Sequence, residues 1–150
     1  MNILLQDVCR STVLAFWALF AALAPANATD LYRTVAGLRY YTGGVTTEEL
    51  RAVALLRTRH NFVLQVVSGL SGGPIADADV RITSPAGKVL LAAPMDGPWL
   101  LVSLLPGRYR IAVSFQDELL QREVEIAATG QSRMTLSFRS SPEVSLLPLR

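Results

Sequence analysis

The chain has 150 residues, 51% of them apolar and 17% charged, and a formal net charge of +2. This composition excludes a disordered chain. The sequence has no basic run or stripe, which argues against nucleic-acid binding. The single cysteine is Cys9, so the residues beyond the N-terminal segment cannot form disulfides or thiolate metal sites.

The first 28 residues have the three parts of a secretory signal. Arg10 supplies a positive flank, an apolar run extends from Val13 to Ala24, and a small-x-small cleavage site ends at Ala28. A helix as long as that run rises about 18 Å, less than the ~30 Å hydrocarbon core of a bilayer. We therefore predict cleavage after Ala28, a periplasmic or secreted protein, and no stable membrane span afterwards. Retention of the segment as an anchor stays open.

Residues 29–60 are expected to form an N-terminal extension, with a short strand over 38–41 and one amphipathic helix. Thr46 as N-cap and Glu49 at the third helical position form a capping box, so the helix should begin there and run to about Arg59. Its main face is predicted to contain Leu50, Val53, Ala54 and Arg57.

Residues 61–139 alternate between apolar and polar side chains, which is typical of β-strands. Gly, Pro and Asp turns separate about seven such runs at the spacing of a sandwich protein, and Pro106-Gly107 has the sequence of a type II turn. The predicted fold class is mainly β, an antiparallel Ig- or transthyretin-like sandwich preceded by the helix, with a C-terminal tail over 140–150. The large side chains expected to fill the space between the sheets are Trp99, Tyr109, Phe115 and Phe138.

Three segments carry a family resemblance. They are 74–82 (Pro-Ile-Ala-Asp-Ala-Asp-Val-Arg-Ile), 96–99 (Asp-Gly-Pro-Trp) and 105–111 (Leu-Pro-Gly-Arg-Tyr-Arg-Ile). In this order they resemble a carboxypeptidase regulatory-like domain of the transthyretin-like type, over Asn61 to about Phe138. The resemblance implies an accessory or binding module of the bacterial envelope, and it supplies no catalytic residues.

Few residues could carry chemistry. Ser71 lies in a G-x-S-x-G match, but a nucleophile elbow needs a strand-to-helix turn and a base, whereas Pro74 and another strand follow here. His60, the single histidine, is expected to interact as a cation with the end of the preceding helix. Three aspartates could bind a hard cation, although such residues more often cap their own turns; they are Asp77, Asp79 and Asp96. We expect no catalytic residue, no metal and no cofactor.

The end of the last predicted strand suggests an enzyme as an alternative. Hydroxyisourate hydrolases share the transthyretin-like fold and end in Tyr-Arg-Gly-Ser, with histidines at their site; Phe138-Arg139-Ser140-Ser141 is similar in part. The chain departs from that ending at the Tyr and Gly positions, continues beyond it, and lacks the histidines. Hydrolysis would then have no base to activate water, but a small hydrolase stays an alternative.

Five arginines have the outward parity of their predicted strands and could form one face that binds an anionic partner. They are Arg81, Arg108, Arg110, Arg133 and Arg139. The competing interpretation is a solvated face balanced by Glu118, Glu123 and Glu125. An unpaired strand edge, which can accept a strand from a partner, is a further option.

We therefore predict an exported, non-catalytic module that binds an unknown protein or ligand of the cell envelope. Besides the hydrolase, a carbohydrate-binding module is an alternative, and it would need a row of exposed aromatic side chains. The candidates for that row are Tyr32, Tyr40 and Tyr41.

Overall fold

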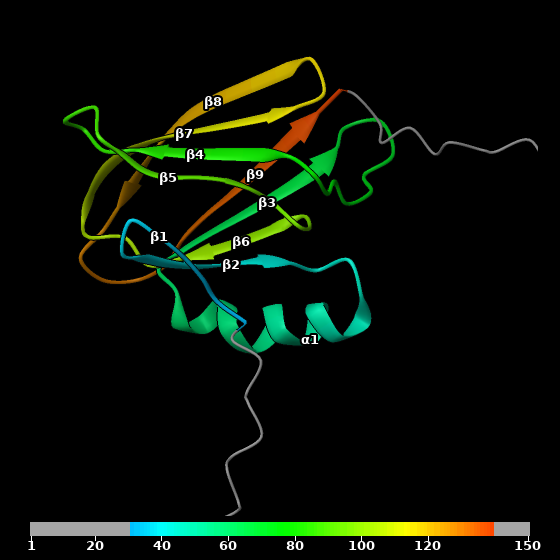
Figure 1. Cartoon of the computed structure of the whole chain (residues 1–150), viewed down its shortest axis with the longest axis horizontal. Coiled ribbons are helices and arrows are strands. Elements are labelled where there is room, and N and C mark those ends of the chain that lie inside the picture. Colours follow the sequence, from blue (N-terminus) through cyan, green and yellow to red (C-terminus); the bar gives the residue numbers. More distant parts are fainter. Residues whose placement is uncertain (1–30, 140–150) are drawn as a thin grey trace, which may run out of the picture. The chain divides into compact units, whose positions relative to one another are not determined.

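The computed structural model describes residues 31–139, so the predicted signal segment and the predicted tail both lie outside the described residues. Residues 32–139 belong to one compact unit, which is mainly β and contains one α-helix (Figure 1). In chain order its elements are β1 (Arg33–Val35), β2 (Leu38–Gly43), α1 (Thr47–Leu56), the 3-10 helix η1 (Arg57–Arg59), β3 (Phe62–Ser68), β4 (Asp79–Thr83), β5 (Val89–Pro94), β6 (Trp99–Val102), β7 (Gly107–Phe115), β8 (Glu118–Ile126) and β9 (Ser132–Phe138).

The strands form two sheets. The five-stranded sheet has the order β1-β2-β6-β3-β9, and the four-stranded sheet has the order β5-β4-β7-β8. Neighbours pair antiparallel except β3 and β9, which run parallel. The expectation of an all-antiparallel arrangement is therefore wrong for this pair. Parallel neighbours need a long connection, and here the intervening chain includes the whole four-stranded sheet.

Both sheets contribute to one hydrophobic core. On β7, Tyr109, Ile111, Val113 and Phe115 point inward and are buried, while the residues between them are exposed or half-buried. Phe138 on β9 reaches the same core from the other sheet and meets the Phe115 ring edge-to-face, with centroids 5.9 Å apart. This alternation is the predicted one, because a strand sends successive side chains to opposite faces.

Trp99 does not lie in that core. It packs, half-buried, with a second cluster on the outer face of the five-stranded sheet, where α1 lies (Figure 1). The helix contributes Val53 and Leu56, whereas Leu50 is 47% exposed. The buried face of α1 therefore differs from the predicted one. Val53 and Leu56 are the helix residues that cluster with Tyr41, Val63 and Leu101 of the sheet.

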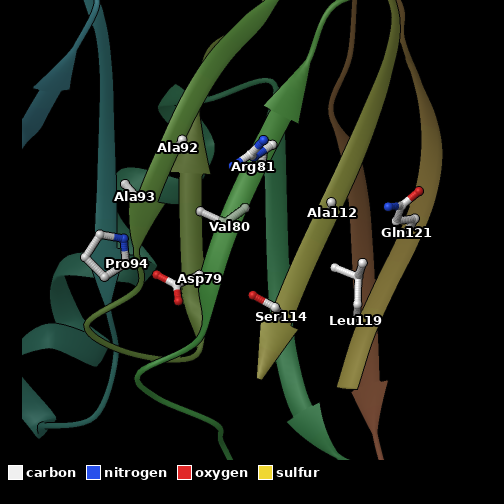
Figure 2. A pocket seen from close by; sticks show the side chains of 10 residues that line it. All are labelled: Asp79, Val80, Arg81, Ala92, Ala93, Pro94, Ala112, Ser114, Leu119 and Gln121. Atoms are coloured by element: carbon white, nitrogen blue, oxygen red, sulfur yellow. The ribbon is translucent and has the colours of Figure 1, made fainter. Parts of the chain in front are cut away.

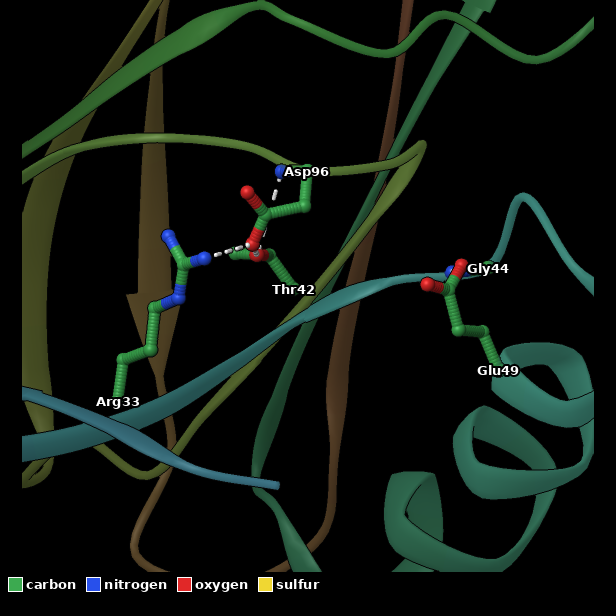
Figure 3. Close-up of polar contacts among 5 residues, drawn as sticks. All are labelled: Arg33, Thr42, Gly44, Glu49 and Asp96. Carbon is green, nitrogen blue, oxygen red and sulfur yellow. Dashed lines mark hydrogen bonds and ion pairs between the residues drawn. The ribbon is translucent and has the colours of Figure 1, made fainter. Parts of the chain in front are cut away.

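The start of α1 has the predicted capping box. Thr46 accepts a hydrogen bond from the Glu49 amide, and Glu49 Oε2 accepts the amides of Val45 and Thr46 at 2.8 and 3.2 Å. The same oxygen accepts the Gly44 amide at 3.0 Å (Figure 3). These donors hold the pKa of Glu49 below its ordinary value, the Val45 amide most strongly. The helix is thus joined to the end of β2 through one carboxylate.

Glu49→Gln should make the protein less stable at neutral pH by about 0.5–1 kcal/mol, and much less so at low pH. Because the folded pKa lies below the unfolded one, this carboxylate stabilises the fold above its ordinary pKa of 4.5 and stops doing so as the pH falls through the lowered value. Urea unfolding at pH 7 and pH 3 measures the difference. Glu48→Gln, in the same helical turn, is the matched control; an equal loss from both variants would mean that only the helix dipole matters.

The segment before the helix is part of the sheet. β2 pairs with β6, and Thr42 on β2 donates its hydroxyl to Asp96 Oδ2 at 2.8 Å (Figure 3). Arg33 on β1, a strand that the sequence analysis did not predict, forms an ion pair with the same carboxylate at 2.8 Å. Residues 33–43 therefore complete the five-stranded sheet instead of forming an extension beside it.

The turn before β7 differs from the predicted type II. Gly107 has a φ of +152°, far from the value near +80° that a type II turn requires at this position. The Tyr109 hydroxyl instead donates to the Leu105 carbonyl at 2.8 Å and closes the loop.

Within residues 31–139 there is no helix with the length and apolar character needed to cross a bilayer.

Candidate functional site

The five arginines of the predicted binding face do not share one face. All are exposed. Arg81 on β4 and Arg108 and Arg110 on β7 lie on the outer face of the four-stranded sheet. Arg133 lies on β9 in the five-stranded sheet, and Arg139 follows that strand. Sequence parity gives the side of each strand correctly, but it does not say which sheet a strand joins.

Acidic residues balance two of the three arginines on the four-stranded sheet. Arg108 lies opposite Glu125 and Arg110 opposite Glu123 in the β7–β8 register, and the second pair has an ion pair of 3.9 Å. Both groups of that pair are about 60% exposed, so solvent screens it and its contribution to stability is small. These contacts fit the solvated-face interpretation.

Arg81 has different neighbours. In register it lies between Ala92 on β5 and Ala112 on β7, so no acidic residue is directly opposite. Within residues 31–139 the structure gives its guanidinium no ion pair. Arg81 is thus the arginine of this face with no acidic residue opposite it in register, although Asp79 lies two residues away on the same face of β4.

Small side chains beside Arg81 leave a trough of about 680 Å³ across the four-stranded sheet (Figure 2). Its volume falls in the range of ligand-binding clefts. Two rows of residues in register line it, namely Ala92, Arg81, Ala112 and Gln121 in one, and Pro94, Asp79, Ser114 and Leu119 in the next.

The trough combines a low floor with polar and apolar groups along it. Ala112 and Ser114, on β7, are half-buried and form the floor. Leu119, on β8, is 58% exposed. Asp79 and Arg81 lie on β4, between β5 and β7 (Figure 2). An extended segment could lay side chains between these rows, place a carboxylate on Arg81 and pack an apolar group on Leu119. The arrangement suits binding, because it sets charged, polar and apolar groups along one hollow.

A second polar cluster surrounds His60 at the start of β3. The His60 Nδ1 lies 3.1 Å from the Ser103 hydroxyl, and Nε2 lies 3.3 Å from the Tyr32 hydroxyl. Arg39 stacks over the Tyr32 ring at 4.6 Å from its centroid. The side chain of Asn61 accepts the Leu104 amide at 2.9 Å and so fixes the loop that carries Ser103.

His60 is not the cationic helix cap that the sequence suggested. It is 9% exposed, and burial, followed by the charge of Arg39, lowers its pKa from the ordinary value of 6.5. It is therefore neutral at pH 7, with one ring nitrogen donating and the other accepting. The sequence placed this residue at the end of the helix but could not show what would cover it.

The imidazole of His60 should titrate below pH 6.5. Because it is the only histidine, its ring proton signals can be followed by NMR without ambiguity. Arg39→Gln should raise the midpoint only in part, since burial is the larger cause. A lowered folded pKa also means that stability falls as the pH drops below 6.5. A midpoint at or above 6.5 would contradict the buried environment.

The other candidate residues are not brought together. Ser71 Oγ accepts the Gly73 amide at 3.2 Å in the turn after β3, about 20 Å of strand away from His60. Asp96 is engaged by Arg33 and Thr42. Within residues 31–139 no three His, Cys, Asp or Glu side chains group as metal ligands would. The aromatic row for a carbohydrate does not form either, because Tyr40 and Tyr41 are 2% and 3% exposed.

Sequence reasoning missed Ser103 and the residues of the trough floor. Ser103 has no motif around it, and its contact with His60 joins positions 43 residues apart. The floor had a weak signal: Ala92, Ala112 and Ser114 are small residues at outward positions of strands. Strand positions more often carry branched or aromatic residues, so three small residues on the outer face of neighbouring strands were a sign of open space.

The comparisons with known proteins are few. No protein-family model matches the chain, and no curated protein matches it. Among solved structures, the one titled "Crystal Structure of S.CueP" is similar with a TM-score of 0.38 and 14% sequence identity. The match covers 49% of this chain and 59% of that one. So low a TM-score does not establish a common fold.

Proposed function

We propose that this chain is an exported, non-catalytic β-sandwich module that binds a partner protein of the cell envelope. Its binding surface is the trough on the four-stranded sheet, with Arg81 as the anchor for a partner carboxylate. The single observation that supports this is the row in which Arg81, with no acidic residue opposite it in register, stands between two alanines. Arg offers a planar, bidentate donor set that suits a carboxylate.

We propose further that the sandwich is of the carboxypeptidase regulatory-like, transthyretin-like type. Support comes from the positions of the three resembling segments. Residues 74–82 lead into β4, Asp96 and Gly97 precede β6, and 105–111 lead into β7. In each case the segment enters a strand of one of the two packed sheets, as the resemblance implies.

Photo-cross-linking in the envelope tests the binding surface. A photoreactive residue at Ala92 should give a discrete adduct, and Arg81→Glu in the same chain should reduce it by about tenfold. Thr135, exposed on the five-stranded sheet, is the matched cross-linker position, and Arg133→Glu is the matched charge reversal. Two results would refute this surface. One is an adduct from Thr135 as strong as the adduct from Ala92, and the other is an Ala92 adduct that Arg81→Glu does not reduce.

A small hydrolase is the second candidate, and the pair of Ser103 and His60 is the observation that favours it. With the His60 Nδ1 accepting, Ser103 Oγ could attack an ester carbonyl while its proton passes to His60 and then to the leaving alkoxide; water would then release the acid. Against this, the Leu104 amide next to the nucleophile, a common oxyanion donor, is already bound by Asn61.

A fluorophosphonate probe separates the two candidates. If the hydrolase proposal is correct, the probe should label the wild type and Ser71→Ala but not Ser103→Ala. The binding-module proposal expects no labelling of any of the three. Ser71→Ala is the matched control, because both serines are exposed and only Ser103 contacts the histidine.

A further inference from the structure

A second hollow, of about 260 Å³, opens at one end of the two sheets. It lies among the β1–β2 turn, the start of β5 and the β6–β7 loop, and it has no residue in common with the trough. It therefore has elements of both sheets around it, unlike the trough, which lies on one outer face. Its lining includes Leu38, Val89, Leu90, Leu104, Leu105 and Tyr109.

Most of the wall of this hollow is apolar, and its polar side chains are Ser103, Lys88 and the Tyr109 hydroxyl. Leu104 and Tyr109 are buried at its base, and Leu38 and Leu90 are half-buried and pack against the main core cluster. At the mouth Leu105 is 80% exposed. The hydrogen bond from the Tyr109 hydroxyl to the Leu105 carbonyl holds this exposed leucine in place, so the mouth is preformed.

Lys88 is the single charged residue of the lining, and no acidic residue lines the hollow. Its backbone is fixed by the turn between β4 and β5: the Lys88 amide donates to Ser84 Oγ at 3.2 Å, and its carbonyl accepts the Ser84 amide at 2.8 Å. Gly87, with a φ of +81°, makes that turn in a conformation that suits glycine. Within residues 31–139 the structure gives the Lys88 ammonium no ion pair.

We propose that this hollow binds the alkyl chain of a medium-chain monocarboxylate and that Lys88 binds its carboxylate. The charge at the mouth selects an anion, and the apolar wall selects a chain. At about 30 Å³ for a group the size of a water molecule, a volume of about 260 Å³ has room for roughly eight or nine methylene-sized groups. This site is independent of the proposed partner surface, because Arg81 and the trough take no part in it.

Titration of the full chain with straight-chain carboxylates, followed by amide NMR, tests the proposal. From butanoate to octanoate the affinity should rise about fourfold per methylene, the value expected for a buried CH₂. Beyond roughly nine carbons the gain should stop, because the space is filled. The shifts should concentrate at Leu38, Leu90 and Ser103.

Lys88→Gln should weaken octanoate binding about three- to fivefold, as expected for one exposed ionic contact, and should leave the affinity for 1-octanol unchanged. Arg51→Gln, which removes one exposed positive charge on α1, is the matched control and should bind octanoate like the wild type. Lys88 is the only lysine, so after methylation its ammonium gives one NMR signal besides that of the N-terminal amine, and octanoate should shift the Lys88 signal alone. Leu105→Ser should weaken octanoate and octanol alike.

Three results would overturn the proposal. One is binding that does not depend on chain length. Another is equal affinity of octanoate for the wild type and Lys88→Gln. The third is a set of shifts at Asp79, Arg81, Ala112 and Ser114 instead of at the mouth, which would place the ligand in the trough. Arg81→Glu should leave octanoate binding intact, so failure of the partner surface and failure of this pocket are distinguishable.

Discussion

Phe138→Ala should lower the free energy of unfolding by about 3–5 kcal/mol, the usual cost of truncating a fully buried phenylalanine. Phe138 is 0% exposed and is the last residue of β9, an edge strand of the five-stranded sheet. Its ring contacts Phe115 from β7 of the other sheet. The substitution therefore removes apolar contact between the two layers and leaves a cavity that the rigid strands cannot close.

Denaturant unfolding of the purified chain measures this loss. Leu119→Ala is the matched control, because Leu119 is apolar but 58% exposed on the outer face of β8, and it should change stability by less than about 0.5 kcal/mol. Phe138→Leu should fall between the two. If Phe138→Ala cost no more than Leu119→Ala, the packing of the two sheets against one core would be wrong.

Gly97→Ala should destabilise the protein by about 3 kcal/mol, at the upper end of the range for overpacking. A Cβ built on Gly97 would come within 2.8 Å of three backbone atoms of Gly43: the carbonyl carbon, the carbonyl oxygen and the Cα. Backbone atoms cannot move aside as a flexible side chain can. The loop between β5 and β6 would have to lift from the end of β2, which carries Thr42 and its bond to Asp96.

Gly73→Ala is the matched control for Gly97→Ala. Neither glycine has a positive φ, so the two variants differ only in the space around the new methyl group. At Gly73 the methyl group would meet only the Ser71 hydroxyl, at 3.2 Å, and stability should change by less than about 0.5 kcal/mol. Thermal unfolding of both variants decides the matter, and similar melting temperatures would show that β2 and the loop do not meet so closely.

These two substitutions test different halves of the assembly that supports the proposed binding surface. Phe138 joins the two sheets through the core, whereas Gly97 joins the loop before β6 to β2. Neither residue lines the trough or the Lys88 hollow. A variant that unfolds would therefore lose binding for a structural reason, while Arg81→Glu and Lys88→Gln change exposed charges and should leave the fold stable.

Local patterns predicted much of the secondary structure. The capping box at Thr46 and Glu49 was recognisable because its two hydrogen bonds join residues three apart. The inward-facing residues of β7 were recognisable because side chains alternate along a strand. Once the turn shows where the strand begins and one residue is known to face inward, the direction of every other residue follows. Both signals depend only on neighbours in the chain.

The misplaced residues share one cause. Trp99 is large and apolar, as core residues usually are. Whether it lies between the sheets or under α1 depends on which side of β6 the helix covers. Arg133 has the same outward parity as Arg81, yet β9 joins the five-stranded sheet through a parallel pairing with β3. No local pattern contains that information.

By itself the sequence determined the β class, the start of the helix, and the inward or outward direction of most strand residues, since these follow from hydrogen bonding and alternation over a few positions. Only the tertiary structure decided which strands are neighbours. That choice put three of the five arginines on the four-stranded sheet and left Arg81 as the one of those three with no acidic residue opposite it. It also placed Ser103 against His60 and set Lys88 beside an apolar hollow. The physical reason is that pairing between distant strands depends on burying whole faces at once, and the free energy of that burial is a property of the assembled sheets.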